Sequence, residues 1–153
     1  MRNIKIVILF FGAACMWACS KDLPDGGGTS AKEFANEWWV KLNDAGSVVK
    51  LSTYNTSLNP DSMWVDDLKH LGSFKSKAKI NSSDLTFSAQ NSANIYSAVT
   101  VTITNGKILK NAGVSKTGNV VDSIYMEVEF SNKPGIKNKI AGSARTRWDE
   151  DDY

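Results

Sequence analysis

The residues that could do chemistry in this chain are few and widely separated. The 153-residue sequence has one histidine, His70, which follows Leu68-Lys69. A serine hydrolase would need this imidazole as its base, but Ser52, Ser62 and Ser73 lie in no Gly-x-Ser-x-Gly motif. A single histidine beside a turn is more typical of an exposed loop than of a catalytic cleft. We therefore expect no catalytic residue, and the residue inventory argues against an enzyme.

The carboxylates form no obvious site either. Asp66 and Asp67 are adjacent, so on a strand they would point to opposite faces and could not form one acid–base pair. Glu127 and Glu129 share a face, but it is the face predicted to be solvated. The acidic tail, residues 149–153, lacks the glycine-containing loop of a calcium site and is expected to stay hydrated. Because His/Cys metal spacings and phosphate-binding glycine motifs are also absent from the sequence, we expect neither a metal nor a cofactor.

The amino terminus has the composition of a secretory leader. A basic start is followed by the apolar run Ile6–Ala14, which is too short to cross a hydrocarbon core of ~30 Å as a helix. This pattern predicts a signal peptide over residues 1–18. The alternative is a transmembrane anchor that extends through Ala18.

Either of the two cysteines could accept a lipid, since Ala14 precedes Cys15 and Ala18 precedes Cys19. We favour Cys19, because polar Ser20-Lys21-Asp22 follows it at once and marks the end of the apolar segment. An acylated cysteine would hold the protein on a membrane. With Cys15 removed and Cys19 acylated, the folded domain would contain no thiol, which excludes a disulfide and a cysteine nucleophile.

The charge of the mature domain would be close to zero. The sequence has 18 Lys and Arg against 16 Asp and Glu, and Arg2 and Lys5 lie in the predicted leader. A neutral domain has no overall field that would attract nucleic acid, so we expect no nucleic-acid partner.

The domain is expected to begin after a tether. Residues 19–29 include Pro24 and Gly26-Gly27-Gly28, which favour a flexible linker. Ser30 and Glu33 then have the spacing of a capping box, which predicts a short helix whose inner face carries Phe34 and Trp38. This helix would plug or abut one end of the domain that spans residues 30–148.

From Glu37 onward the hydrophobic pattern has a period of two. Phe74, Ser76, Ala78 and Ile80, for example, alternate with three lysines, as in strands that have one buried face. The predicted strands are Trp38–Leu42, Val48–Tyr54, Met63–Leu68, Phe74–Ile80, Leu85–Ala89, Ile95–Thr104, Lys107–Lys110, Ile124–Phe130 and Lys139–Arg147.

Turn residues separate these strands. Asn105-Gly106 is the favoured pair for a two-residue hairpin, and reversals are also expected at residues 44–46, 59–61, 118–119 and 132–135. Eight or nine antiparallel strands, each with one apolar face, can bury that face by closing into a barrel. The fold class is therefore all-β, a single barrel, with a two-layer sandwich as the alternative.

Several blocks of the sequence resemble one family when they are taken in order. That family is the Bacteroidota lipid-binding putative hydrolases, small lipoproteins with a lipocalin-like (calycin) barrel. The resemblance covers essentially the whole mature domain and implies a lipophilic ligand. The blocks that carry it are Glu37–Val40, Leu51–Thr56, Met63–Asp67, Val101–Lys107, Gly118-Asn119 and Asp122–Phe130.

The resemblance also implies site residues. Calycin barrels pair a tryptophan of the first strand with an arginine of the last, and Trp38 or Trp39 with Arg145 or Arg147 could form that structural closure here. As residues that line a ligand cavity, we choose the aromatic side chains Tyr54, Trp64 and Tyr125.

Three functions are consistent with these features. The first is a lipid-anchored module that binds a small lipophilic or amphiphilic molecule in an open-mouthed apolar cavity. The second is a filled barrel that serves as a protein-interaction subunit of an outer-membrane assembly through an exposed apolar patch. The third is the hydrolase of the family label, which the residue inventory opposes. An aspartate after the acylated cysteine is the usual signal that keeps a lipoprotein in the inner membrane, and here Ser20 follows Cys19. We therefore expect the protein to be located in the outer membrane, at either face.

Overall fold

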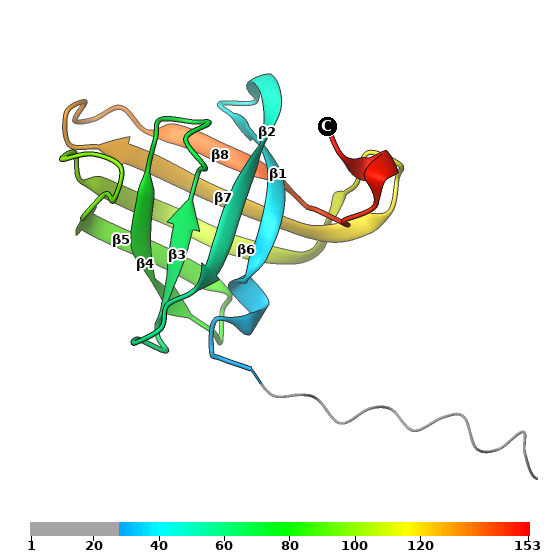
Figure 1. Ribbon diagram of the computed structural model, residues 1–153, viewed down its shortest axis with the longest axis horizontal. Helices are drawn as coiled ribbons and strands as arrows, with labels where there is room; N and C mark the ends of the chain where they lie inside the picture. Colours follow the sequence, from blue (N-terminus) through cyan, green and yellow to red (C-terminus); the bar gives the residue numbers. More distant parts are fainter. Residues whose placement is uncertain (1–27) are drawn as a thin grey trace, which may run out of the picture.

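The computed structural model describes residues 28–153 (Figure 1). The predicted signal peptide, Cys15, Cys19 and most of the tether lie outside these residues. Within residues 28–153, no helix is long and apolar enough to cross a membrane. The strands are β1 (Asn36–Leu42), β2 (Ala45–Asn55), β3 (Ser62–Asp66), β4 (Lys75–Asn81), β5 (Thr86–Ser92), β6 (Val101–Val114), β7 (Val120–Phe130) and β8 (Asn138–Ala144).

The eight strands form one closed antiparallel barrel in which each strand pairs with its neighbours in the chain. β1 closes the barrel by pairing with β8, with Trp38 opposite Ala144 and Val40 opposite Gly142. The prediction of an all-β barrel is confirmed, and the sandwich is excluded because residues 36–144 form one closed sheet. Closure pairs the strand edges that an open sheet would leave exposed.

Large side chains fill the interior of the barrel. The alternation predicted for β4 is confirmed, because Phe74, Ser76, Ala78 and Ile80 are buried while Lys77 and Lys79 are exposed. An eight-stranded barrel is just wide enough for side chains to fill it. The largest fully buried side chains are Trp38, Phe34, Phe74, Leu51, Met63, Ile103, Ile124, Met126 and Ile140.

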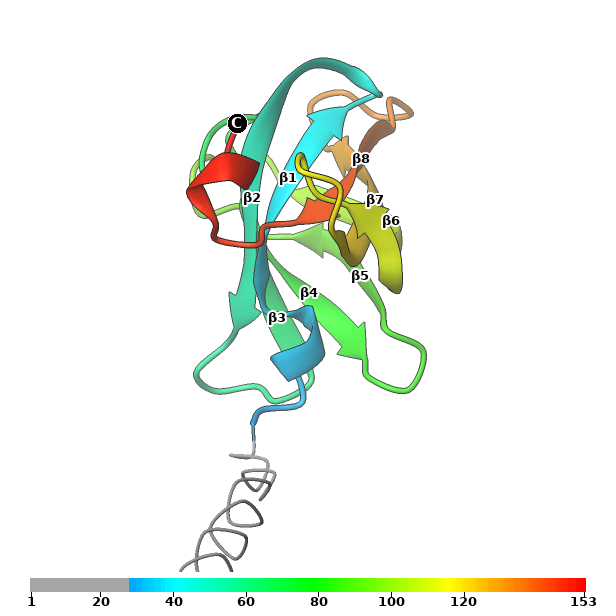
Figure 2. The ribbon, with the colours of Figure 1, turned by 90° about the vertical axis from the view of Figure 1, so that its right-hand side faces the viewer.

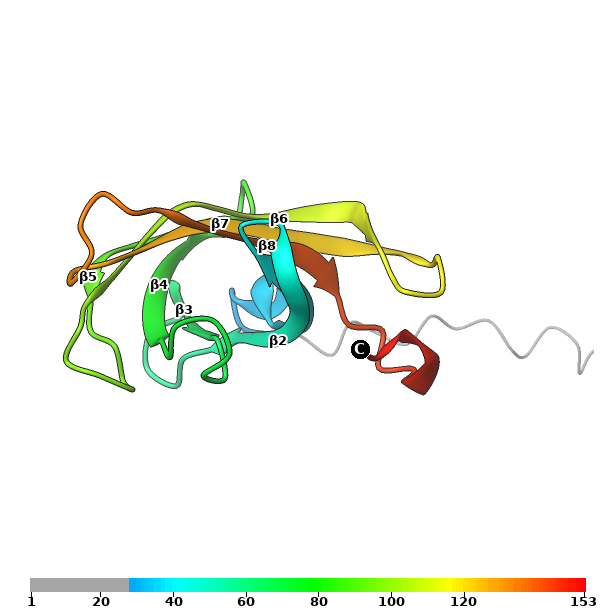
Figure 3. The same ribbon diagram turned by 90° about the horizontal axis from the view of Figure 1, so that it is seen from above.

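One end of the barrel is plugged by η2 (Lys32–Phe34), a single turn of 3-10 helix. Figure 2 shows this turn at the lower end of the barrel, and Figure 3 shows it within the ring of strands. The predicted capping box is wrong: no side chain caps the turn, because the Ser30 hydroxyl donates to the carbonyl of Pro60. The ring of Phe34 is buried and meets Phe87 edge to face, with centroids 6.4 Å apart.

Thr53 ties this plug to the barrel wall. Trp38 belongs to β1 and not to the helix, and its indole Nε1 donates to Thr53 Oγ1 at 2.8 Å. The same hydroxyl donates to the carbonyl of Phe34. One buried polar group therefore satisfies both the core tryptophan and the end of η2.

Asn105-Gly106 does not form the predicted hairpin. Both residues lie within β6, which runs on as one strand, so the barrel has eight strands and not nine. Asn105 has φ 55°, and the register with β7 shifts between Thr104 and Lys107, which is a β-bulge. A bulge and a type I′ turn both require a residue that tolerates positive φ, so the sequence pair fits either.

The predicted reversals elsewhere lie between strands. The first turn is one residue earlier than predicted, at Asn43-Asp44 with φ 51° and 59°. Beyond the barrel, β6 and β7 continue together as a hairpin, which we call the arm (residues 109–123; Figures 1 and 3). The arm reverses between Val114 and Val120, where Gly118-Asn119 was predicted to turn.

The acidic tail is ordered, contrary to expectation. Residues Asp149–Asp151 form the 3-10 turn η3, and Asp151 is only 1% exposed. Its carboxylate accepts hydrogen bonds from the backbone N–H and hydroxyl of Thr117, both at 2.7 Å, and from the Thr146 hydroxyl at 2.7 Å. These contacts fasten the last residues of the sequence to the tip of the arm.

Candidate functional site

A groove of about 640 Å³ runs over the outer surface of β4–β7. Its walls are exposed or half-buried polar side chains, and its floor is the buried Ile80, Phe87 and Gly106. Its volume is within the range of small-molecule sites in proteins. The walls are formed by Lys79, Asn81, Thr86, Ser88, Asn105, Lys107 and Tyr125.

The strand register explains why these residues meet. Asn81 lies opposite Thr86, Thr86 opposite Lys107, and Lys107 opposite Tyr125, so four strands contribute one continuous row. Successive side chains of a strand alternate between faces, and the neighbours of these residues face the core. The row therefore points outward.

Gly106 allows two strands to approach closely at the floor of the groove. A Cβ at this position would lie 2.4 Å from the carbonyl oxygen of Phe87 and 2.5 Å from its ring. The absence of a side chain lets Phe87 pack directly on the strand next to the bulge. Glycine in a strand interior often marks such a close approach.

Of the described residues that line the groove, two are lysines and none is acidic, although wall residue Asn81 donates a hydrogen bond to Asp84 at 2.8 Å. The ammonium of Lys107 lies 5.3 Å from the centroid of the Tyr125 ring, a favourable cation–π arrangement. The Tyr125 hydroxyl donates to Glu127 at 3.1 Å, and desolvation together with this carboxylate raises the tyrosine pKa. The pKa of Glu127 is lowered by hydrogen bonds from Asn105 and Tyr125 and by Lys137.

A second hollow of about 420 Å³ adjoins the first and shares Lys79 and Ser88 with it. It extends the polar surface toward β3 and adds Lys77, Gln90 and Thr104. Again, none of the described residues that line it is acidic. The two hollows together form an elongated basic and neutral-polar surface.

All three aromatic residues chosen from the sequence lie on the outer face. Tyr54 and Trp64 are half-buried on β2 and β3, and Tyr125 is half-buried on β7. The expectation that they line the interior is wrong, because each alternates with a buried residue of its strand. Only Tyr125 borders the groove; Trp64 lies between the ammonium groups of Lys75 and Lys77, 5.4 and 5.0 Å from its centroid.

Tyr54 belongs instead to a polar cluster around Asp66. This carboxylate accepts hydrogen bonds from the hydroxyls of Tyr54 at 3.1 Å and Tyr96 at 2.7 Å. Desolvation acts to raise the pKa of Asp66, but the bonds from Tyr96, the Leu68 N–H and Tyr54 lower it overall. The same bond to Asp66 raises the pKa of Tyr96 to about 12. The cluster fixes the β5–β6 loop on β3.

Asp67 has a different role, one that the sequence did not indicate. It is fully buried, and its two oxygens accept four backbone N–H bonds of 2.8–2.9 Å. All four donors lie within the next seven residues, so this carboxylate organises the β3–β4 loop around itself. The donors are Lys69, Leu71, Ser73 and Phe74.

The tryptophan and arginine candidates separate into an inner and an outer group. Trp38 is fully buried in the core, whereas the guanidinium carbon of Arg145 lies 5.9 Å from the Trp39 ring on the outer face. Arg145 also donates to Glu37 at 2.7 Å and to both oxygens of Asp152, and these two carboxylates raise its pKa. Arg147 is exposed. The Trp39–Arg145 pair therefore joins the chain that follows β8 to β1 and does not close the barrel interior.

His70 is exposed in the β3–β4 loop, as the sequence predicts. Its Nδ1 lies 3.1 Å from the backbone carbonyl of Lys50. A carbonyl oxygen is not a nucleophile that the imidazole could activate. In the part of the chain that the structure describes, no three His, Cys, Asp or Glu residues are grouped so that they could hold a metal ion.

These features define a small barrel protein with a filled interior and a groove on its outer face. The family model described as lipid-binding putative hydrolase matches residues 23–149, and the chain belongs to this family. The match covers all eight strands. No curated protein matches the sequence.

Proposed function

We propose that this protein is a membrane-anchored, lipocalin-like barrel that binds one amphiphilic molecule, whose polar end occupies the outer groove. The observation that carries the proposal is the groove itself, because it places Lys79, Lys107 and Tyr125 around one hollow of ligand size. Membership of the lipid-binding family supports an amphiphile as the occupant. The filled interior supports a site on the outer face.

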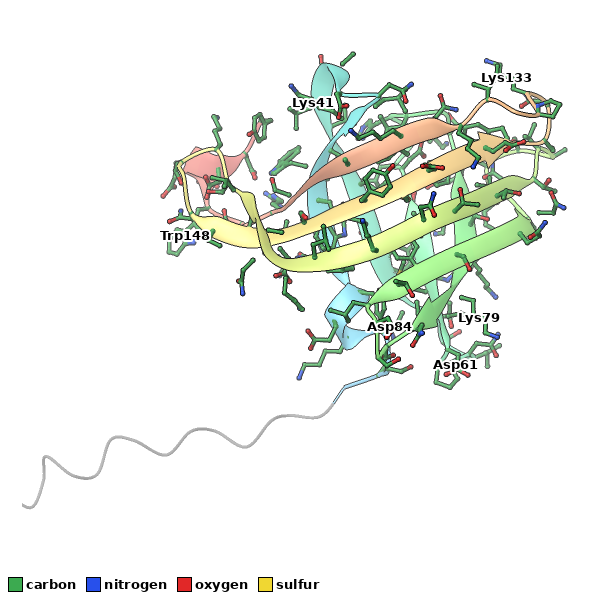
Figure 4. The ribbon with its side chains drawn as sticks, turned by 180° about the vertical axis from the view of Figure 1, so that it is seen from behind. Lys41, Asp61, Lys79, Asp84, Lys133 and Trp148 are labelled. Carbon is green, nitrogen blue, oxygen red and sulfur yellow. The ribbon has the colours of Figure 1, made fainter. Side chains whose placement is uncertain are left out.

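Native mass spectrometry of the protein as purified from its own host tests ligand binding. We expect an added mass of one lipophile on the wild type, and its loss in Tyr125→Ala. Lys133→Gln is the control at a distant site, because this exposed lysine lies in the β7–β8 loop, away from the groove (Figure 4). A wild-type protein that never carries or takes up a lipophile would overturn the proposal.

The anchor is part of the same proposal. Acylation of Cys19 would place the barrel on the outer membrane of a Bacteroidota cell, at either face. We expect Cys19→Ser to release the protein from the membrane fraction and Cys15→Ser to leave it there. The opposite pattern would assign the lipid to Cys15.

A protein-interaction subunit is the second candidate, favoured by the arm. Val114 and Val120 are paired at its tip and are 61% and 66% exposed, and Trp148 beside it is 65% exposed (Figure 4). Exposed apolar side chains that gather in one place mark interaction sites. We expect Trp148→Ala to reduce recovery of any partner from solubilised membranes; equal recovery would remove this candidate.

A further inference from the structure

We propose that the groove selects an anionic, hydroxyl-rich headgroup, namely a phosphorylated sugar or cyclic polyol. This inference rests on the proposed function and specifies the chemistry of its ligand. Three features of the groove support it: lysines without acidic partners, amide and hydroxyl groups on neighbouring strands, and nearby carboxylates that already have hydrogen-bond partners, Glu127 and Asp84.

The lysines of the groove are free to meet an anion. Within residues 28–153, no carboxylate lies within 4.0 Å of the ammonium groups of Lys79, Lys107 or Lys77. In contrast, Lys110 pairs with Glu33 at 2.6 Å and Lys139 with Asp44 at 2.7 Å. Because opposite charges attract and like charges repel, two lysines without an ion-pair partner favour a headgroup of net negative charge over a zwitterionic or cationic one.

The remaining wall groups suit a ligand with many hydroxyls. Side-chain amides and hydroxyls both donate and accept hydrogen bonds, and the two hollows present several of them on neighbouring strands. The ring of Tyr125 adds an apolar face at one side of the groove. These groups come from Asn81, Asn105, Gln90, Thr86, Ser88 and Thr104. Three of them already have a protein partner: Asn81 donates to Asp84 at 2.8 Å, and Thr104 and Asn105 donate to Glu127.

Glu127 borders the groove but does not oppose an anion. Its carboxylate accepts the Tyr125 hydroxyl at 3.1 Å and lies 3.4 Å from the ammonium of Lys137. Its charge is thus balanced by a lysine that does not line the groove. The anionic end of the ligand would lie between Lys79 and Lys107, away from this carboxylate.

The test uses two short-chain lipids that differ in headgroup and a soluble headgroup without acyl chains. Titration calorimetry of the full-length chain would compare dioctanoyl-phosphatidylinositol, dioctanoyl-phosphatidylcholine and inositol 1-phosphate. We expect the wild type to bind the inositol lipid about tenfold more tightly than the choline lipid, which corresponds to ~1.4 kcal/mol. Lys79→Gln/Lys107→Gln should abolish that preference, and Lys41→Gln/Lys133→Gln, at exposed sites outside the groove, should keep it (Figure 4).

Each outcome separates the inference from the function on which it rests. Equal binding of both lipids, unchanged in the groove variant, would overturn the headgroup assignment and leave amphiphile binding in place. Binding of none of the three compounds would overturn the proposed function. Binding of inositol 1-phosphate alone would support the headgroup site and make a free phosphorylated polyol its ligand.

Discussion

The two faces of strands β4–β7 obey different constraints. On the inner face, Phe87, Ile124 and Met126 are at most 3% exposed, and each contacts a closely packed core. On the outer face, Asn81, Thr86 and Lys107 are exposed and surround the groove. The inner face determines whether the chain folds, because packing there tolerates little change of volume. The outer face can change its side chains at little cost, and binding sites are built on such positions.

The strongest test of this contrast is Trp38→Ala. Loss of the buried indole should lower the free energy of unfolding by ~3–5 kcal/mol, the usual cost of removing a large aromatic side chain from a core. Urea denaturation measures it, with the exposed Trp148→Ala as control, which should change stability by less than about 0.5 kcal/mol. A small effect of Trp38→Ala would mean that the interior is not tightly packed.

Asp67→Ala should have the next largest effect. It would leave four backbone N–H groups of the β3–β4 loop without their acceptor, and we expect a loss of about 3 kcal/mol. Amide hydrogen exchange of residues 69–74 should also become faster. Asp61→Ala, an exposed loop aspartate (Figure 4), should leave both measurements unchanged, and a similar loss in that variant would remove the special role of Asp67.

Acid should weaken the outer polar cluster before it affects the apolar core. The pKa of Asp66 is lower in the folded protein than its ordinary value, so its contribution to stability is present above about pH 4. That contribution is lost as the pH falls from about 4 through the folded-state pKa. Melting temperatures across this range should fall less steeply in Asp66→Asn than in the wild type; parallel curves would contradict the assignment.

The smallest expected change in stability is that of the groove variant. Lys79→Gln/Lys107→Gln should alter the free energy of unfolding by no more than about 0.5 kcal/mol, since both lysines are exposed and neither has an ion-pair partner within residues 28–153. Urea denaturation beside the binding titration would show this. A loss of several kcal/mol would mean that these lysines maintain the fold and would weaken the separation of the two faces.

The alternating pattern was enough to predict the barrel because it reports directly which side of a strand is buried. It identified the inward residues of β4 and β7, such as Ile80 and Met126, and hence the outward position of their neighbours. It could not distinguish a bulge from a turn at Asn105-Gly106, because both need the same backbone freedom. Continued pairing of β6 with β7 decides between them, and that is a long-range property.

The groove and the ordered tail were missed for the same reason. The row Asn81–Thr86–Lys107–Tyr125 comes from four strands, and nothing local in the sequence sets their register. Asp151 receives hydrogen bonds from Thr117, which lies 34 residues earlier in the chain. The local sequence shows only a run of acidic residues, and such a run predicts exposure to solvent. Asp67 is different, because all its hydrogen-bond donors lie within the next seven residues. An aspartate that accepts bonds from the backbone of the following loop is a local pattern that the sequence could have predicted.

The plug η2 also determines how the barrel would withstand a pulling force. Any tension on the segment before Gly28 reaches Ser30, which is hydrogen-bonded to Pro60 and Ser82, and then η2. There Glu33 is paired with Lys110 of β6, and the Phe34 carbonyl is held by Thr53 of β2. The load would therefore be shared by two separate strands before it could peel β1 from β2. A barrel fastened in this way should resist unzipping from its amino-terminal strand when it is dragged along or away from a surface.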